Sequence, residues 1–228
     1  AVLHDLRATG TRTHMSAKTL LFAAVAIGLG YYSFSGGASG ESTIDGLVFP
    51  QSIRISGSTQ TLVGGGTRFK YGAVKVYAAG LYMESSGLSS LKKFSGTPAS
   101  ALAKEQPFFD AITSSRPAKT LLLRFHRSVG APAVVEALRD ALKPKMDAKV
   151  VSKFESLLSD VLGGSVPQGS QLFLTCKGDA LHVSTTESTG PHVSAKGLCP
   201  ALIGVYLGKS PISQPIKAGV AAGFAKLQ

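Results

Sequence analysis

Hydrophobic and polar residues alternate with a period of two over much of the segment 47–125, a pattern that predicts half-buried β-strands. We predict strands over 47–55, 59–63, 74–84 and 120–125, with a tight turn at the three glycines 64–66. Two further strands, 170–175 and 180–185, flank Lys177, Gly178 and Asp179 and predict a hairpin. Short strands that are joined by turns favour antiparallel pairing.

Elsewhere hydrophobic residues recur every three or four positions, which predicts helices with one apolar face. Short helices between 86 and 115 are interrupted at Pro98 and Pro107. Longer helices are predicted over 133–143, from Asp147 as N-cap to Gly163, and over 195–207 and 214–227. This order of elements predicts an α+β fold, an antiparallel sheet with its helices on one face.

The N-terminal segment has a different pattern. Residues 19–34 are uncharged and end near the tandem tyrosines Tyr31 and Tyr32, which predicts a single transmembrane helix. A signal-peptide core and a buried helix are the alternatives. The domain boundaries that follow are a polar arm over 1–18, the transmembrane helix over 19–34, a Gly/Ser-rich tether over 35–46 and a folded domain over 47–228. The chain does not begin with methionine, which indicates a processed N-terminus or a fragment.

Charge sets the orientation of that helix and narrows the partners. Basic residues precede 19–34 and acidic ones follow it, so the positive-inside rule places the main domain on the side opposite the N-terminus. Residues 1–45 carry no net charge, and the net charge of +11 therefore lies on 46–228. Acidic lipid headgroups, acidic proteins and nucleic acid are all compatible with this charge. Nucleic acid is excluded because the basic run Lys143, Lys145, Lys149 and Lys153 has no interleaved aromatic residues; a solvated helix face is the simpler interpretation of that run.

Candidate reactive residues are few. Cys176 and Cys199 allow one disulfide, but two buried free thiols are the favoured interpretation. A metal site from Cys176 with His182, or from His192 with Cys199, has no recognised ligand spacing, so we predict neither a metal nor another cofactor. No nucleophile motif or phosphate-binding loop is present in the sequence. Arg68, between the glycines and a buried strand, is either a structural ion-pair partner or the anion end of a pocket.

Several short stretches, taken in order, resemble the chalcone isomerase-like superfamily over residues 47–228. They are Gly64-x-Gly66-x-Arg68, Val76–Tyr82, Gln106–Phe109, Leu121–Gly130, Pro167-x-Gly169-Ser170 and Ile203–Ser210. The resemblance implies an open-faced β-sandwich with a ligand cleft between the antiparallel sheet and the helices. The superfamily includes true isomerases, fatty-acid-binding relatives and non-catalytic members, some of them attached to mitochondrial membranes.

The isomerase residues do not all have equivalents in this chain. The arginine of the isomerases falls on Arg68, but their strand threonine falls on Tyr77, their catalytic tyrosine near Ala133 and their asparagine near Asp140. No tyrosine lies between Tyr82 and Tyr206. The resemblance therefore implies a protein that is not an enzyme, with no catalytic residues.

The remaining site hypothesis is that Arg68 and Tyr77 bind a carboxylate at the end of an apolar cleft. The alternative is that Arg68 pairs with an internal acid and Tyr77 packs in the core. For function, we expect an accessory subunit of a respiratory-chain or other large membrane complex, in the mitochondrial inner membrane with the domain facing the intermembrane space, in contact with membrane lipids and other protein subunits. A fatty-acid-binding protein tethered to a membrane (a plastid membrane is the alternative location) and an active chalcone isomerase are the competing hypotheses.

Overall fold

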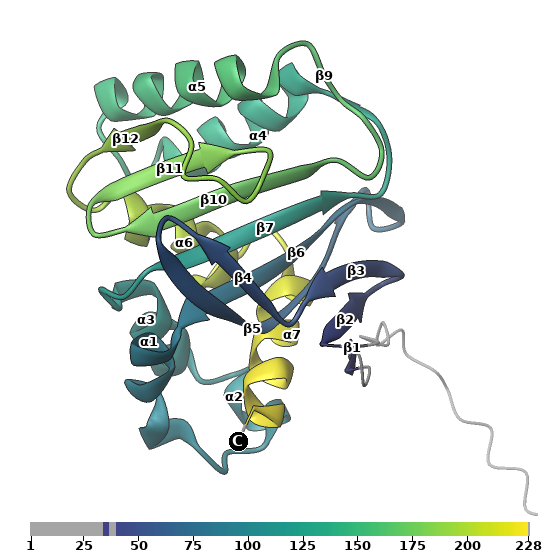
Figure 1. Ribbon diagram of the computed structural model, residues 1–228, viewed down its shortest axis with the longest axis vertical. Helices are drawn as coiled ribbons and strands as arrows, with labels where there is room; N and C mark the ends of the chain where they lie inside the picture. The colour runs from purple at the N-terminus through teal and green to yellow at the C-terminus, as the bar shows by residue number, and fades with distance from the viewer. Residues whose placement is uncertain (1–33, 37–39, 228) are drawn as a thin grey trace, which may run out of the picture. The chain divides into compact units, whose positions relative to one another are not determined.

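The computed structural model describes residues 34–36 and 40–227 (Figure 1). Its central element is a seven-stranded antiparallel sheet with the strand order β12-β11-β10-β7-β6-β5-β4. The strands are β4 (Ser52–Ile55), β5 (Ser58–Lys70), β6 (Val74–Glu84), β7 (Lys119–Phe125), β10 (Gln171–Lys177), β11 (Ala180–Ser184) and β12 (His192–Ser194). The expected α+β class is confirmed.

Helices cover one face of this sheet and bury the larger of two apolar cores (Figure 1). They are α1 (Ser85–Ser89), η1 (Lys92–Phe94), α2 (Ala99–Leu102), α3 (Gln106–Ser114), α4 (Ala131–Leu142), α5 (Ala148–Leu162), α6 (Leu198–Leu207) and α7 (Gln214–Lys226). A two-stranded sheet of β8 (Val129–Gly130) and β9 (Ser165–Val166) joins the segments that flank α4 and α5. Alternate residues of β6, among them Tyr77, Ala79 and Leu81, face this core.

The opposite face of the sheet carries a smaller apolar core. A three-stranded sheet of β1 (Phe34–Gly36), β2 (Glu41–Ile44) and β3 (Leu47–Pro50) contributes Phe49 to it, and β4 crosses in front of β7 (Figure 1). The Tyr82 hydroxyl donates to the Pro50 carbonyl at 2.8 Å, which ties β6 to the end of β3. Because β1 and β2 lie within 35–46 or next to it, that segment is not wholly the tether we expected; folded structure begins before residue 47.

The predicted transmembrane helix, 19–34, lies outside the described residues except for its last position, Phe34, which belongs to strand β1. No helix in the described part of the chain combines the length and the hydropathy that crossing a membrane requires.

Local signals located several elements correctly. The Asp147 side chain accepts a hydrogen bond from the Lys149 amide at 2.8 Å and caps α5, which ends at Gly163 with a φ of 63°. The hairpin of β10 and β11 turns at Gly178 and Asp179, as predicted.

The turn predicted at glycines 64–66 is wrong. These residues lie inside the 13-residue strand β5, and the chain turns only after Lys70. A Cβ at Gly64 or Gly66 would overlap backbone atoms of α7, at Gly219 and Pro215 respectively. A Cβ at Gly219 would likewise overlap the Gly65 carbonyl. The glycines allow the backbones of α7 and β5 to touch, because glycine in a strand permits another backbone to approach closely.

Candidate functional site

Arg68 and Tyr77 are paired residues on β5 and β6, next to the hairpin that joins these strands. The pairing shifts register between Arg68 and Phe69, an irregularity of the kind that redirects side chains near functional sites. The guanidinium carbon of Arg68 lies 5.7 Å from the centre of the Tyr77 ring, within the range of a cation–π interaction. The structure thus brings together the two residues that sequence reasoning selected.

A third residue, Tyr206, completes the cluster. It lies on α6, and its hydroxyl oxygen is 3.2 Å from that of Tyr77. Both phenols are buried, and the edge of the Tyr77 ring system meets Phe125 at 5.7 Å between centroids. The sequence does not single out Tyr206, because it lies 129 positions from Tyr77 and no local pattern connects the two residues. The Ile203–Ser210 stretch was the available signal.

The two phenols leave one donor unused. They carry two O–H protons, and one of these forms the bond between Tyr77 and Tyr206. Among the described residues, no further acceptor bonds either hydroxyl. Whichever phenol donates to the other, one buried O–H group therefore lacks an acceptor, which is uncommon in folded proteins.

Both phenols are also neutral at physiological pH. Burial raises the pKa of Tyr77, and the nearby positive charge of Arg68 opposes this effect without cancelling it. Burial raises the pKa of Tyr206 well above its usual value, and the Tyr77 phenol raises it further. Neutral phenols with raised pKa values donate hydrogen bonds but make poor bases.

Arg68 has no acidic counter-ion among residues 34–36 and 40–227. None of the ion pairs formed within the described residues includes it, although its side chain is partly shielded from solvent. The alternative interpretation, in which Arg68 serves as a structural ion-pair partner, finds no support there. Its guanidinium carries five donors and lies within hydrogen-bonding reach of the Tyr77 hydroxyl, beside the unused phenol proton.

The start of α7 closes the site on the side of β5. The Ser213 hydroxyl donates to the Thr67 carbonyl at 3.0 Å, immediately before Arg68. Further along α7, the buried ammonium of Lys217 donates to Gln106 at 2.7 Å and to the Gly208 carbonyl at 2.9 Å. This tie between α3, α6 and α7 gives a structural reason for two of the family-like stretches, 106–109 and 203–210.

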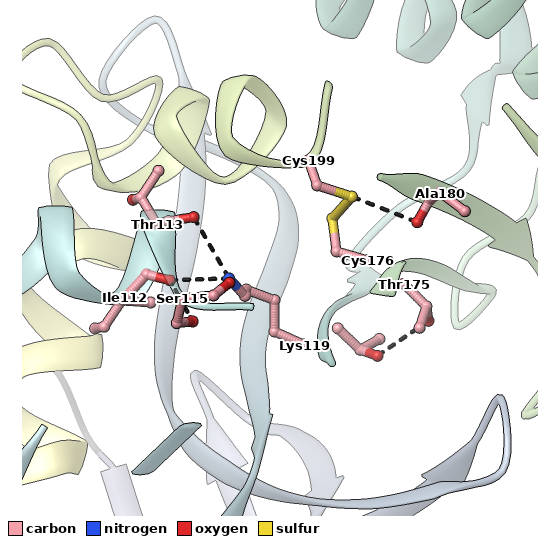
Figure 2. The surroundings of a disulfide bond; sticks show 9 residues. Ile112, Thr113, Ser115, Lys119, Thr175, Cys176, Ala180 and Cys199 are labelled. Carbon is pink, nitrogen blue, oxygen red and sulfur yellow. Dashed lines mark hydrogen bonds between the residues drawn. A yellow bond between two sulfur atoms is a disulfide. The ribbon is translucent and has the colours of Figure 1, made fainter. Parts of the chain in front are cut away.

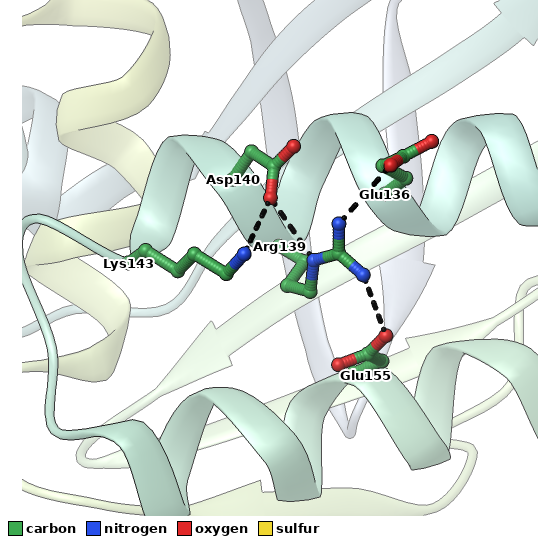
Figure 3. Close-up of polar contacts among 5 residues, drawn as sticks. All are labelled: Glu136, Arg139, Asp140, Lys143 and Glu155. Atoms are coloured by element: carbon green, nitrogen blue, oxygen red, sulfur yellow. Dashed lines mark hydrogen bonds and ion pairs between the residues drawn. The ribbon is translucent and has the colours of Figure 1, made fainter.

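The positions that match the isomerase tyrosine and asparagine lie on α4. Ala133 and Asp140 are both exposed there. Asp140 accepts hydrogen bonds from Arg139 and Lys143, each at 3.0 Å, and Arg139 also pairs with Glu136 and Glu155 (Figure 3). Hydrogen bonds from these two cations lower the pKa of Asp140. Asp140 is thus a member of a surface ion-pair network.

The cysteines differ from the expectation of two free thiols. Cys176 on β10 and Cys199 on α6 form a disulfide, with 5.6 Å between their Cα atoms (Figure 2). That spacing suits a bridge, and sequence alone supplies no such distance. The bridge removes both thiols as ligands from the two metal pairs that the sequence offered. His182 and His192, which belong to the consecutive strands β11 and β12, pair across these strands with ring centroids 4.8 Å apart.

A buried cation lies beside the disulfide. The Lys119 ammonium donates to the carbonyls of Ile112 at 3.0 Å, Thr113 at 3.4 Å and Ser115, at the end of α3 (Figure 2). Burial lowers the pKa of Lys119 to about 8. Three carbonyls occupy all three of its donors, so Lys119 acts as a helix C-terminal cap.

Comparison with known proteins identifies the fold. Residues 41–220 match the family model described as chalcone isomerase-like. Among solved structures, the chain is similar to the crystal structure of an Arabidopsis thaliana fatty-acid binding protein, with 24% identity and a TM-score of 0.61 over 79% of this chain and 96% of that one. A search of curated proteins finds no match.

Proposed function

The chain belongs to the chalcone isomerase-like family, and we propose that within this family it binds the carboxylate of a fatty acid without catalysing a reaction. The observation that carries the proposal is the unused bonding capacity at one place: the guanidinium of Arg68 without a carboxylate, next to a buried phenol pair with a spare proton. A carboxylate accepts bonds from both donors at once.

The surroundings of the phenols suit an acyl chain. Phe125 contacts Tyr77, and both belong to the large apolar core beneath the helices. The contact between α7 and β5 leaves no room for a ligand at the glycines of β5. The fold similarity to a fatty-acid binding protein agrees with this assignment.

Three observations support binding without chemistry. The phenols have raised pKa values, Ala133 offers no hydroxyl, and Asp140 is held in surface ion pairs. These features support a site that binds an anion over one that shifts a proton on a chalcone.

The test compares the full chain with Arg68→Met. Binding is measured by displacement of a fluorescent fatty acid and by native mass spectrometry. Loss of a charge-assisted hydrogen bond is worth about tenfold to a hundredfold in affinity. Arg116→Met, an exposed arginine near the opposite end of β7, is the matched control and should bind like the wild type.

The methyl ester of the same acid sharpens the assignment. The ester keeps the chain but loses the anion, so wild type and Arg68→Met should bind it equally weakly. Equal affinity of the two proteins for the free acid would refute the carboxylate site, and turnover of a chalcone would refute the non-catalytic assignment.

A second candidate is a non-catalytic accessory subunit of a membrane complex, with the domain facing the mitochondrial intermembrane space. It is favoured by the apolar segment 19–34 and by the disulfide, since disulfides persist in oxidising compartments. Complexome profiling of the source membrane tests it: migration with a large complex supports the subunit role, and migration as a monomer contradicts it.

A further inference from the structure

The turn between β5 and β6 presents large apolar side chains to solvent. In this hairpin tip, residues 69–75, the exposed fractions are 37% for Phe69, 87% for Tyr71 and 36% for Val74. These are three of the few large hydrophobic residues that the described chain exposes. Scattered exposed hydrophobic residues need no explanation, but several at one protruding turn do.

Tyr71 is also placed at some cost to the fold. Its φ of 53° lies in the left-handed region, beside Gly72 with a φ of 74°. Asparagine or glycine is preferred at such a position, and a bulky residue there is a marked outlier. With 87% of its surface exposed, the Tyr71 ring gains little from the interior in return. A contact with another molecule therefore explains a tyrosine at this position better than a role in folding does.

Basic residues are concentrated in the tip and in the strand segment next to it. Segments 66–76 and 124–130 contain five basic residues and no acidic one, and backbone pairing holds them side by side, with the His126 amide bonded to the Val76 carbonyl at 3.0 Å. The Lys70 ammonium lies 5.1 Å from the centre of the Tyr71 ring. Asp45, which pairs with Lys75 at 2.7 Å, is the acid that approaches this group from the neighbouring β2–β3 turn, where it also lies 3.9 Å from His126.

We propose that the hairpin tip docks on an anionic lipid surface, with Tyr71 and Phe69 at the headgroup level and the flanking lysines against the acidic headgroups. Tyrosine favours this interface because its ring is apolar and its hydroxyl is polar. The tip is small and has basic neighbours. A bilayer surface can bind such a tip, whereas a stable protein partner needs a larger complementary area. Arg68 lies just before the tip, so docking places the carboxylate site close to the membrane surface.

The experiment labels the tip itself, because the full chain also contains the apolar segment 19–34. Tyr71→Cys carries an environment-sensitive fluorophore, and Asp160→Cys on the exposed side of α5 is the matched control. Phosphatidylcholine vesicles with and without phosphatidylserine are added. We expect a blue shift and quenching by brominated lipid at position 71, with anionic vesicles only, and no change at position 160.

Two variants measure the contributions of ring and charge, with the fluorophore then attached at Val74→Cys. Tyr71→Asn suits the left-handed turn but removes the ring, and Lys70→Gln removes one charge. For Lys70→Gln the concentration of anionic vesicles that gives half the shift should rise about fivefold. Fatty-acid affinity without vesicles should stay unchanged in both variants, so this docking proposal and the proposed function can fail separately.

Three results would overturn the proposal. The first is vesicle-bound protein whose label at position 71 shows no shift. The second is an equal shift at positions 71 and 160. The third is a shift produced by raising the protein concentration without vesicles, which would assign the tip to contact with a second copy of the chain.

Discussion

A positively charged side chain lies near each end of β7, and the two differ in whether their donors are bonded inside the fold. At the first end, Lys119 is buried, its three donors are bonded to carbonyls of α3, and its neighbour Cys176 is locked to α6 by the disulfide (Figure 2). At the other end, roughly 20 Å along the strand, Phe125 supports Tyr77, and beside it Arg68 has no acidic partner within the described structure.

This difference separates a structural cation from a binding one. A cation whose donors are all bonded inside the fold contributes to stability and has nothing left to offer a ligand. A cation without an acidic partner, beside one unused hydroxyl donor, contributes little to stability and is available to bind an anion. If the two ends of β7 differ as their contacts indicate, substitutions at the two ends should have different effects on stability and on binding.

The largest effect on stability is expected at the contact between the β5 glycines and α7, which lies near Arg68. In Gly66→Ala, the added Cβ meets backbone atoms of Pro215 and Ile216, which cannot rotate away. We expect the free energy of unfolding to fall by more than about 3 kcal/mol. The control is Gly164→Ala, because a Cβ there meets no atom within 4 Å and φ is not in the left-handed region. Urea unfolding of both variants measures the difference. Similar unfolding midpoints would show that α7 and β5 are not in backbone contact at Gly66.

The second largest effect on stability is expected from the disulfide at the Lys119 end of β7. Replacing both Cys176 and Cys199 by alanine releases a loop with a sequence separation of 23 residues, which should lower the free energy of unfolding by about 3 kcal/mol. Fatty-acid affinity should change less than about twofold, because Tyr206 lies near the other end of α6 and keeps its packing. A large loss of affinity in a still-folded double variant would mean that the two ends are coupled.

The sequence predicted those features of the fold that depend on nearby residues. The Asp147 cap, the stop at Gly163 and the hairpin turn at Gly178 each follow from chemistry within a few positions. The α+β class followed from the order of such elements. Arg68 and Tyr77 were found because one carries a charge beside a buried strand and the other lies within it.

The missed features depend on residues far away in the chain. Glycines 64–66 predict a turn when considered alone, and their reason for being glycine is a helix near the C-terminus. Tyr206 reaches Tyr77 across 129 positions, and the count of two cysteines gives no distance between them. No periodicity encodes such contacts, so the phenol pair and the disulfide required the folded structure.

The smallest effect is expected in the pH dependence of stability, which should differ between Lys119 and Arg68. The folded protein releases the Lys119 proton at about pH 8, whereas an unfolded lysine keeps it to about pH 10.4. Between these values the unfolded chain binds more protons, so the stability of the wild type relative to Lys119→Met should rise with pH, by at most about 1.4 kcal/mol per pH unit. Below pH 8 the difference should be flat. Guanidinium groups do not exchange protons in this window, so wild type and Arg68→Met should give parallel curves of stability against pH. A slope that depends on Arg68, or a flat Lys119 difference up to pH 10, would contradict the assignment of Lys119 as the desolvated structural cation and Arg68 as the available one.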